Sequence, residues 1–93
     1  MQSILQRIKE CYVCHAKTGL HKHHIFFGKN RSMSEKNGFT CHLCWNDHEG
    51  TYGVHGKYGD ELDLRLKQDC QRKYEESHPR EEFMKLVGKN YLD

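Results

Sequence analysis

The sequence lacks long hydrophobic runs and has few hydrophobic residues altogether. Only 35% of its 93 residues are hydrophobic, so we expect a single small domain over residues 1–93 with a modest core. No apolar stretch approaches the roughly 18 residues of a membrane-spanning helix, which predicts no membrane partner. The first residues also lack the basic region and apolar stretch of a secretory signal, and we therefore expect a cytoplasmic protein with reduced thiols.

The sequence also has little net charge, and this charge is unevenly placed. The formal net charge is +2. Residues 1–59 hold eight Lys and Arg against four Asp and Glu, whereas residues 60–93 hold seven against nine. The weakly basic first part permits nucleic-acid binding but does not by itself indicate it, because a solvated surface explains the charges equally well.

Cysteine is the residue type that the sequence uses in a clear pattern. Four of the five cysteines form two Cys-x-x-Cys pairs, Cys11 with Cys14 and Cys41 with Cys44. Thiolates at this spacing typically hold a structural Zn²⁺, which ties two distant segments together and stabilises a small domain. The fifth, Cys70, lies in a helical pattern and is expected to be a small buried hydrophobe.

Local patterns predict a mixed α and β architecture in the first two thirds of the chain. Residues 1–10 have one apolar edge and are expected to form a short helical turn. Alternating side chains predict strands at residues 20–27 and 39–43. A helical turn is expected over residues 34–38, because Gly38 readily takes the left-handed conformation that ends a helix. Four glycines indicate that residues 50–59 form a loop after a helix that begins at Trp45.

The last third of the sequence predicts two helices. Asp60 is expected to cap the first of them. Its apolar stripe is most simply core and consists of Leu62, Leu66, Cys70 and Tyr74, with Leu64 beside them. Ser77, before Pro79, is expected to begin the last helix, and Gly88 to end it.

Histidines lie between and after the two cysteine pairs. His23 and His24 are adjacent, so on a strand they point to opposite faces and serve different roles. His48 and His55 flank the following helix-to-loop region and could complete a second, open metal site. Hydrolysis of a phosphodiester needs a cation to neutralise charge on its oxygens and a base to deprotonate water, and neutral His suits the second task. Three further histidines are expected to be ordinary surface or core residues: His15, His21 and His78.

These features occur in an order that resembles a known family. The segments that carry the resemblance are Leu20-His21-Lys22-His23-His24-Ile25-Phe26, Ser34-Glu35-Lys36, Leu43-Cys44, Gly53-Val54-His55, Leu62-Asp63-Leu64 and Gly88-Lys89-Asn90-Tyr91-Leu92. Together they are similar to a phage- and prophage-borne group of HNH endonucleases, which have the ββα-metal (His-Me finger) fold. The resemblance implies an α+β domain with a zinc-stapled ββα-metal core over residues 11–56 and a helical C-terminal extension over residues 60–93.

The resemblance also implies an activity, namely metal-dependent hydrolysis of DNA phosphodiester bonds. His24 would be the general base, and His23 and His48 would hold a catalytic divalent metal, Mg²⁺, Mn²⁺, Ni²⁺ or Zn²⁺, separate from the structural Zn²⁺. His55 would be a third ligand. In the family an Asn often orients the general base, and Asn37 lies near that place.

The expected partner is DNA. Lys29 and Arg31, in the loop between the predicted strands, are expected phosphate contacts from their charge and position. A chain of 11.1 kDa leaves little room for base readout. We therefore expect little sequence specificity, and a homodimer or a targeting or packaging partner protein. The resemblance further implies a phage or prophage origin in a bacterial host cell.

One departure from the family leaves the fourth zinc ligand open. Members usually carry a zinc-binding His or Cys three residues after the cysteine that corresponds to Cys44. Here that residue is Asp47. Ligand softness favours Cys41 instead, whereas the register favours Asp47, because it leaves His48 at the start of the helix. The departure also supports a second hypothesis, a non-catalytic zinc-binding module, derived from an HNH nuclease, that binds DNA or protein. The pair His23 and His24 favours the enzyme, since a binding module has no need for it.

Overall fold

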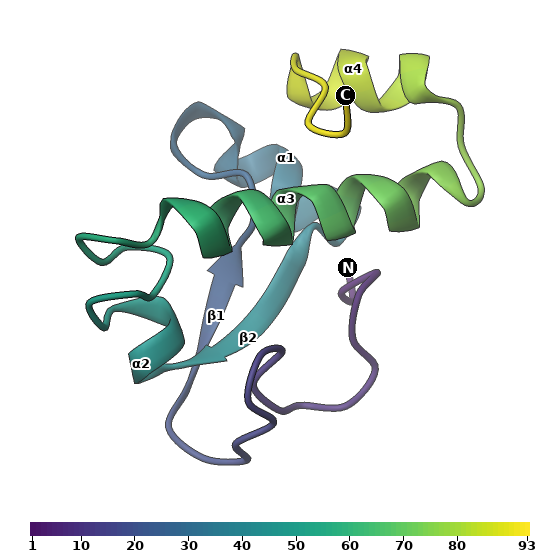
Figure 1. Ribbon diagram of the computed structural model, residues 1–93. Helices are drawn as coiled ribbons and strands as arrows, with labels where there is room; N and C mark the ends of the chain where they lie inside the picture. Colours follow the sequence, from purple (N-terminus) through teal and green to yellow (C-terminus); the bar gives the residue numbers. More distant parts are fainter.

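The protein is a small α+β domain built on a two-stranded sheet. The computed structural model describes all residues, 1–93. In chain order the elements are β1 (Leu20–His24), a 3-10 turn η1 (Gly28–Asn30), α1 (Arg31–Asn37), β2 (Thr40–Cys44), α2 (Trp45–His48), α3 (Asp60–Glu75) and α4 (Arg80–Val87). The long helix α3 lies across the sheet, with α2 near one end of the strands and α4 beside α3 (Figure 1). No helix combines the length and apolar character needed to cross a membrane.

Pairing of the two strands gives the sheet an inner and an outer face. β1 and β2 are antiparallel, with His23 opposite Cys41, and residues paired in this way point to the same face. The inner face carries His23, Cys41 and Leu43, and α3 covers it, because Cys41 and Leu43 belong to the same core cluster as α3 side chains. The outer face carries Lys22 and His24.

Most of the expected elements are present, with shifted ends. The strands occupy the predicted regions, residues 50–59 form no helix or strand, and α1 ends at Gly38 in the left-handed conformation, with φ +73°. Asp60 is the first residue of α3 rather than its cap, and no side chain caps this helix. The last helix begins at Arg80, not Ser77, because Pro79 with its extended backbone precedes it.

The expectation of a helical turn over residues 1–10 is wrong. This segment has no helix and is hydrogen bonded to β2 and to the end of α1. The Ile4 amide donates to the Gly38 carbonyl at 2.9 Å, and the Gln6 side chain accepts from the His42 amide at 2.7 Å. Both bonds join the segment to distant parts of the chain instead of to itself. Ile4 packs on the core, whereas Ile8 is exposed.

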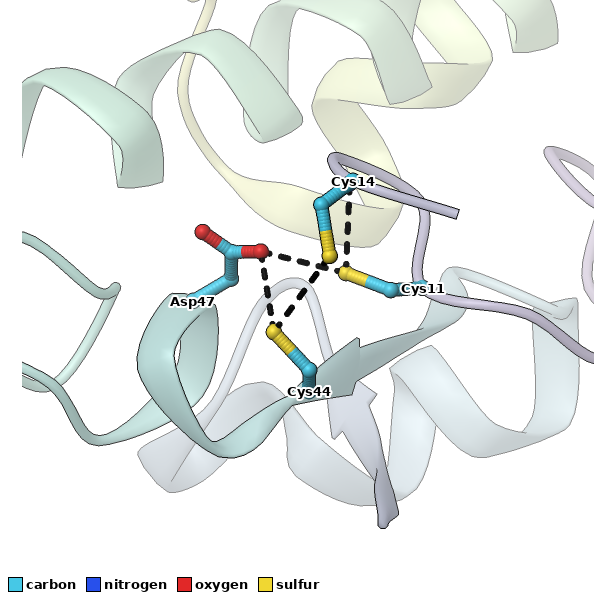
Figure 2. Close-up of side chains that lie close together, drawn as sticks. All are labelled: Cys11, Cys14, Cys44 and Asp47. Atoms are coloured by element: carbon cyan, nitrogen blue, oxygen red, sulfur yellow. Dashed lines mark hydrogen bonds between the residues drawn. The ribbon is translucent and has the colours of Figure 1, made fainter. Parts of the chain in front are cut away.

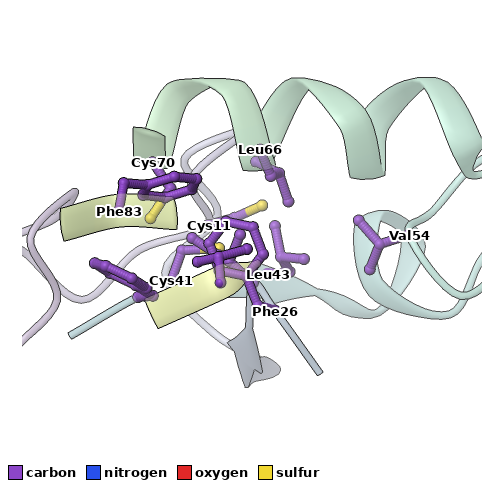
Figure 3. Close-up of a cluster of buried hydrophobic side chains, with 11 residues drawn as sticks. Cys11, Phe26, Cys41, Leu43, Val54, Leu66, Cys70 and Phe83 are labelled. Carbon is purple, nitrogen blue, oxygen red and sulfur yellow. The ribbon is translucent and has the colours of Figure 1, made fainter. Parts of the chain in front are cut away.

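The core is a single cluster of eleven buried side chains between the sheet, α3 and α4. Its members are Cys11, Ile25, Phe26, Phe39, Cys41, Leu43, Val54, Leu66, Cys70, Phe83 and Val87 (Figure 3). Cys70 is fully buried, as expected, whereas Leu64 is 45% exposed and lies outside the apolar stripe of α3. Fully buried Gln71 donates to Glu75 and Asn90 and accepts from the Tyr91 amide, which ties the C-terminal segment to α3 without an unpaired polar group.

Replacement of Phe39 by Ala tests the core. Phe39 is fully buried, and its ring centroid lies 5.7 Å from that of Phe26 and 5.4 Å from that of Tyr74. We expect Phe39→Ala to lower the free energy of unfolding by about 3–5 kcal/mol, measured by urea unfolding of the zinc-loaded protein. The control is Leu64→Ala, a truncation at an exposed position of α3, which should cost about 0.5 kcal/mol or less. Equal losses in the two variants would contradict the assigned core.

Candidate metal centres

Three cysteines and one aspartate converge where the N-terminal segment meets α2. The side chains of Cys11, Cys14, Cys44 and Asp47 point toward a common centre (Figure 2), and their ligand atoms all lie within 4.8 Å of one another. The Asp47 Oδ2 atom is 3.2 Å from the Cys11 sulfur and 3.1 Å from the Cys44 sulfur, and the sulfurs of Cys14 and Cys44 are 3.6 Å apart. The cluster therefore brings together ligands that are up to 36 residues apart in the sequence.

Local hydrogen bonds shape the turn that carries the first two cysteines. The Cys11 amide donates to the Ala16 carbonyl at 2.8 Å, and the His15 amide donates to the Cys11 carbonyl at 2.9 Å. His15 closes this turn with φ +67°, the only positive φ of a residue other than glycine. The Cys14 amide lies 3.5 Å from the Cys11 sulfur and points toward it, so the turn directs both sulfurs to one side.

The spacing of these four ligand atoms suits a tetrahedral ion. With Zn–S bonds of about 2.3 Å, two sulfurs of a tetrahedral site lie roughly 3.8 Å apart, close to the 3.6 Å between Cys14 and Cys44. Three thiols and one carboxylate are donors that Zn²⁺ accepts. This group could hold a metal ion, and its donor set fits the expected structural Zn²⁺.

Cys41, the alternative fourth ligand, is not part of this cluster. Its side chain is 1% exposed and packs in the hydrophobic core. Burial, and then the neighbouring Cys11, raise the pKa of the Cys41 thiol to about 12. The physical reason is strand alternation: Cys41 and Cys44 are three residues apart on β2, so they point to different faces of the sheet. The structure thus brings Asp47, rather than Cys41, to the other three ligands.

Three histidines form a second cluster that could hold a metal ion: His23, His48 and His55. The ring centroids of His48 and His55 are 4.7 Å apart, and those of His23 and His48 are 5.3 Å apart. β1 supplies His23, the last residue of α2 is His48, and the following loop supplies His55. His55 is exposed whereas His23 is buried, so the cluster is closed on its inner side and open to solvent on the other.

A tightly folded loop returns His55 to the cluster. The Val54 amide donates to the Asp47 carbonyl and the His55 amide to the His48 carbonyl, both at 2.9 Å. These bonds hold the loop against α2. Gly56 is required here, since a Cβ at that position would lie 1.8 Å from the Gly50 carbonyl oxygen.

Burial keeps His23 neutral and leaves one of its nitrogens without a partner. Burial, followed by the charges of His48 and His55, lowers the pKa of His23 to about 3. Burial and His55 also lower the pKa of His48. The Nε2 atom of His23 is buried and has no hydrogen-bond partner, which is costly in a folded protein unless a ligand satisfies it. Neutral imidazole with a free nitrogen is the form that binds metal ions, so these residues fit a bound cation.

His24, the predicted base, lies outside both clusters. Its Nε2 atom is 2.9 Å from Oε1 of Glu35 on α1, whereas His23 points to His48 and His55, as expected for adjacent residues of a strand. Asn37 does not reach His24: its side-chain amide donates to the Met33 carbonyl one turn back in α1, at 2.9 Å. The expected orienting role of Asn37 therefore has no support in its contacts.

A single hollow of about 220 Å³ connects His24 with the histidine cluster. It is lined by Lys22, His23, His24, Phe27, Arg31, His48 and His55. Of the two predicted phosphate contacts, Arg31 lines this hollow, whereas Lys29 is exposed and does not. Larger hollows lie near the N-terminal segment, but their linings contain neither cluster.

Several residues at the site were not predicted from the sequence. His21 was expected to be an ordinary residue, yet its Nδ1 lies 2.9 Å from Nδ1 of His48, as a partner that orients a ligand would. Strand alternation could have indicated this, since His21 and His23 are two residues apart. Lys22 and Glu35 pair at 2.8 Å beside His24, and no local pattern joins these two.

Zinc content distinguishes the two candidates for the fourth ligand. We expect Asp47→Ala to weaken zinc binding by at least the roughly 10- to 100-fold that changes beyond the ligand shell cause. Cys41→Ala should keep one tightly held zinc, because Cys41 lies in the core. The measurement is competition with a chromophoric chelator on the purified variants. Loss of zinc from Cys41→Ala together with its full retention in Asp47→Ala would reverse the assignment.

A second ion is expected at the histidine cluster. After the cysteine site is filled with zinc, titration with Co²⁺ should show one further site by absorption spectroscopy. We expect His48→Ala to weaken this second site and to leave zinc in the first, because removal of one of three ligands leaves an incomplete set. His78→Ala is the control, since His78 is an exposed histidine stacked on Tyr74. Unchanged Co²⁺ affinity in His48→Ala would contradict the assignment.

Comparisons with known proteins identify no relative of this chain. Neither a scan against protein-family models nor searches of curated proteins and of solved structures give a match.

Proposed function

We propose that this chain is a metal-dependent endonuclease of the HNH type, which hydrolyses DNA phosphodiester bonds. The observation that carries the proposal is the hollow in which three histidines that could hold one ion lie beside a fourth, His24, that is outside their set. A cation site next to an independent imidazole supplies both needs of phosphodiester hydrolysis, charge neutralisation and proton removal. A purely structural zinc module needs neither.

The order of the elements supports the fold part of this proposal. Two antiparallel strands are followed directly by a short helix, and the two candidate ligands His23 and His48 lie on the first strand and on that helix. We propose that β1, β2 and α2 are the ββα-metal unit, and that the Cys11, Cys14, Cys44 and Asp47 cluster is its structural zinc site.

The proposed roles follow from position and chemistry. His24 removes a proton from the attacking water at the ring nitrogen that does not face Glu35. His23, His48 and His55 hold a divalent cation, which when bound neutralises charge on the phosphate oxygens. Arg31, which lines the same hollow, contacts the phosphate backbone of the DNA. Lys29, exposed in the turn η1, contacts a neighbouring phosphate outside the hollow.

The proposed substrate interface is small, which bears on specificity. α3 is the one long helix of the chain, and its first turn carries Asp60, Glu61 and Asp63, a negative end that disfavours its insertion into the major groove. We propose that cleavage has little sequence specificity and that a second copy or a targeting partner directs it.

A plasmid-nicking assay tests the function. With supercoiled DNA and Mg²⁺, Mn²⁺, Ni²⁺ or Zn²⁺, the zinc-loaded wild type should convert plasmid to nicked or linear forms. His24→Ala should reduce the rate by about 10²–10⁴, the usual contribution of a general base, and should bind Co²⁺ as the wild type does. His78→Ala serves as the control for a histidine outside the site.

Three outcomes decide between the proposed enzyme and the alternative. Metal-dependent cleavage that is lost in His24→Ala supports the nuclease. No cleavage above the level of His24→Ala with any of the four metals would exclude it. DNA binding without cleavage in the same samples, measured by gel shift, would instead support the non-catalytic module.

A further inference from the structure

The ring of His24 is held by one hydrogen bond, and its partner is a carboxylate. Nε2 of His24 lies 2.9 Å from Oε1 of Glu35, and the His24 side chain is 10% exposed. Nδ1 of His24 has no hydrogen bond within the chain and is not among the buried polar atoms without a partner. One ring nitrogen is therefore engaged by protein, and the other is open.

The ionisation of Glu35 determines which ring nitrogen carries the proton. Lys22 lies 2.9 and 2.8 Å from the two carboxylate oxygens of Glu35. Hydrogen bonds from Lys22, and then from His24, lower the pKa of Glu35 to about 2. An ionised carboxylate can only accept hydrogen bonds. Nε2 of His24 must therefore donate, and in the neutral ring the free electron pair is on Nδ1.

The position of Glu35 is itself fixed by its neighbour in the sequence. Ser34 is fully buried, and its hydroxyl accepts a hydrogen bond from the Phe26 amide at 3.2 Å and donates to the Phe26 carbonyl. The Ser34 carbonyl accepts from the Phe39 amide at 2.9 Å. α1 is thus bonded to the chain just after β1 and just before β2, so Glu35 is presented beside the outer face, where Lys22 and His24 both point.

We infer that Glu35 is the positioning residue for His24, in the place that the family resemblance gives to Asn37. It holds the imidazole ring through Nε2 and leaves Nδ1 directed away from the carboxylate as the proton acceptor. Lys22, bonded to both carboxylate oxygens, holds Glu35 in place. The inference rests on the proposed function for its catalytic consequence, but the hydrogen bond and the ring state can be measured without cleavage.

The direct test is the imidazole proton of His24, observed by NMR in ¹⁵N-labelled, zinc-loaded protein. In the wild type, at mildly alkaline pH, the Nε2 proton should give a downfield resonance that exchanges slowly with water, because a carboxylate binds it. Glu35→Ala should lose this resonance. Glu35→Gln should retain it at a less downfield position, since the amide oxygen also accepts. Its persistence in Glu35→Ala would overturn the inference, as would its absence from the wild type.

Cleavage kinetics test whether the hydrogen bond serves the base. We expect Glu35→Ala to lower the maximal single-turnover rate by about 10- to 100-fold, as loss of an orienting partner does, with little change in the DNA concentration that gives half that rate. Glu35→Gln should recover part of this loss. Glu61→Gln is the matched control, because it removes an exposed carboxylate at the start of α3 that makes no hydrogen bond or ion pair with His24.

The two experiments separate failure of this inference from failure of the proposed function. If Glu35→Ala cleaves DNA as fast as the wild type, and amide spectra show that both proteins are folded, the positioning role is overturned. A wild type that never cleaves refutes the nuclease while the NMR result still reports on the His24–Glu35 bond. If Glu35→Ala does not fold, Glu35→Gln is the decisive variant. The inference is overturned if Glu35→Gln lacks the downfield His24 resonance but cleaves as fast as Glu61→Gln.

Discussion

A single turn of helix, α2, is shared by both ligand sets, and the arrangement of the site depends on it. Asp47 belongs to the cysteine cluster, and the next residue, His48, belongs to the histidine cluster. α2 has four residues, none of them buried, far below the roughly 12–15 residues at which an isolated helix becomes marginally stable. Its place must therefore come from outside itself: from the cluster that Asp47 forms with Cys11, Cys14 and Cys44, which could hold a metal ion, and from the loop that bonds to its carbonyls. An ion bound at one cluster would thereby also fix the geometry of the other.

The strand register places two neighbouring histidines, His23 and His24, in different environments. On the inner face, burial keeps His23 neutral with an unpartnered nitrogen, which suits a metal ligand. On the outer face, His24 meets an ionised carboxylate, Glu35, which orients the ring without competing for its second nitrogen. A slip of one residue in the pairing of β1 with β2 would exchange the two environments. Cys41, opposite His23 and packed in the core, opposes such a slip, because a slip would turn its buried thiol outward.

Sequence patterns predicted the parts of this fold that depend on local periodicity and failed where distant segments meet. The strands, the turn ended by Gly38 and the apolar stripe of α3 follow from alternation and helical spacing, and the structure has them. The choice between Cys41 and Asp47 stayed open because it depends on where β2 ends and α2 begins. Each residue lies three positions from Cys44, so the spacing in the sequence fits both ligands. The partner of His24 was missed for a related reason: Glu35 is eleven residues away, and only the packing of α1 beside β1 joins them. Asn37, chosen by its place in the sequence, bonds within its own helix instead.

The distribution of apolar contacts explains why ions matter more in one half of the molecule than in the other. α3, α4 and the strands share a core in which Phe26, Phe39 and Phe83 pack edge to face or tilted, and this part gains its stability from burial. α2 contributes no buried side chain, and the loop that follows contributes only Val54 to the core. Segments with so few apolar contacts open at low free-energy cost. The apolar half therefore holds β1 and α1 in place, whereas His48 and His55 would gain most of their order from ions bound at the two clusters that could hold them.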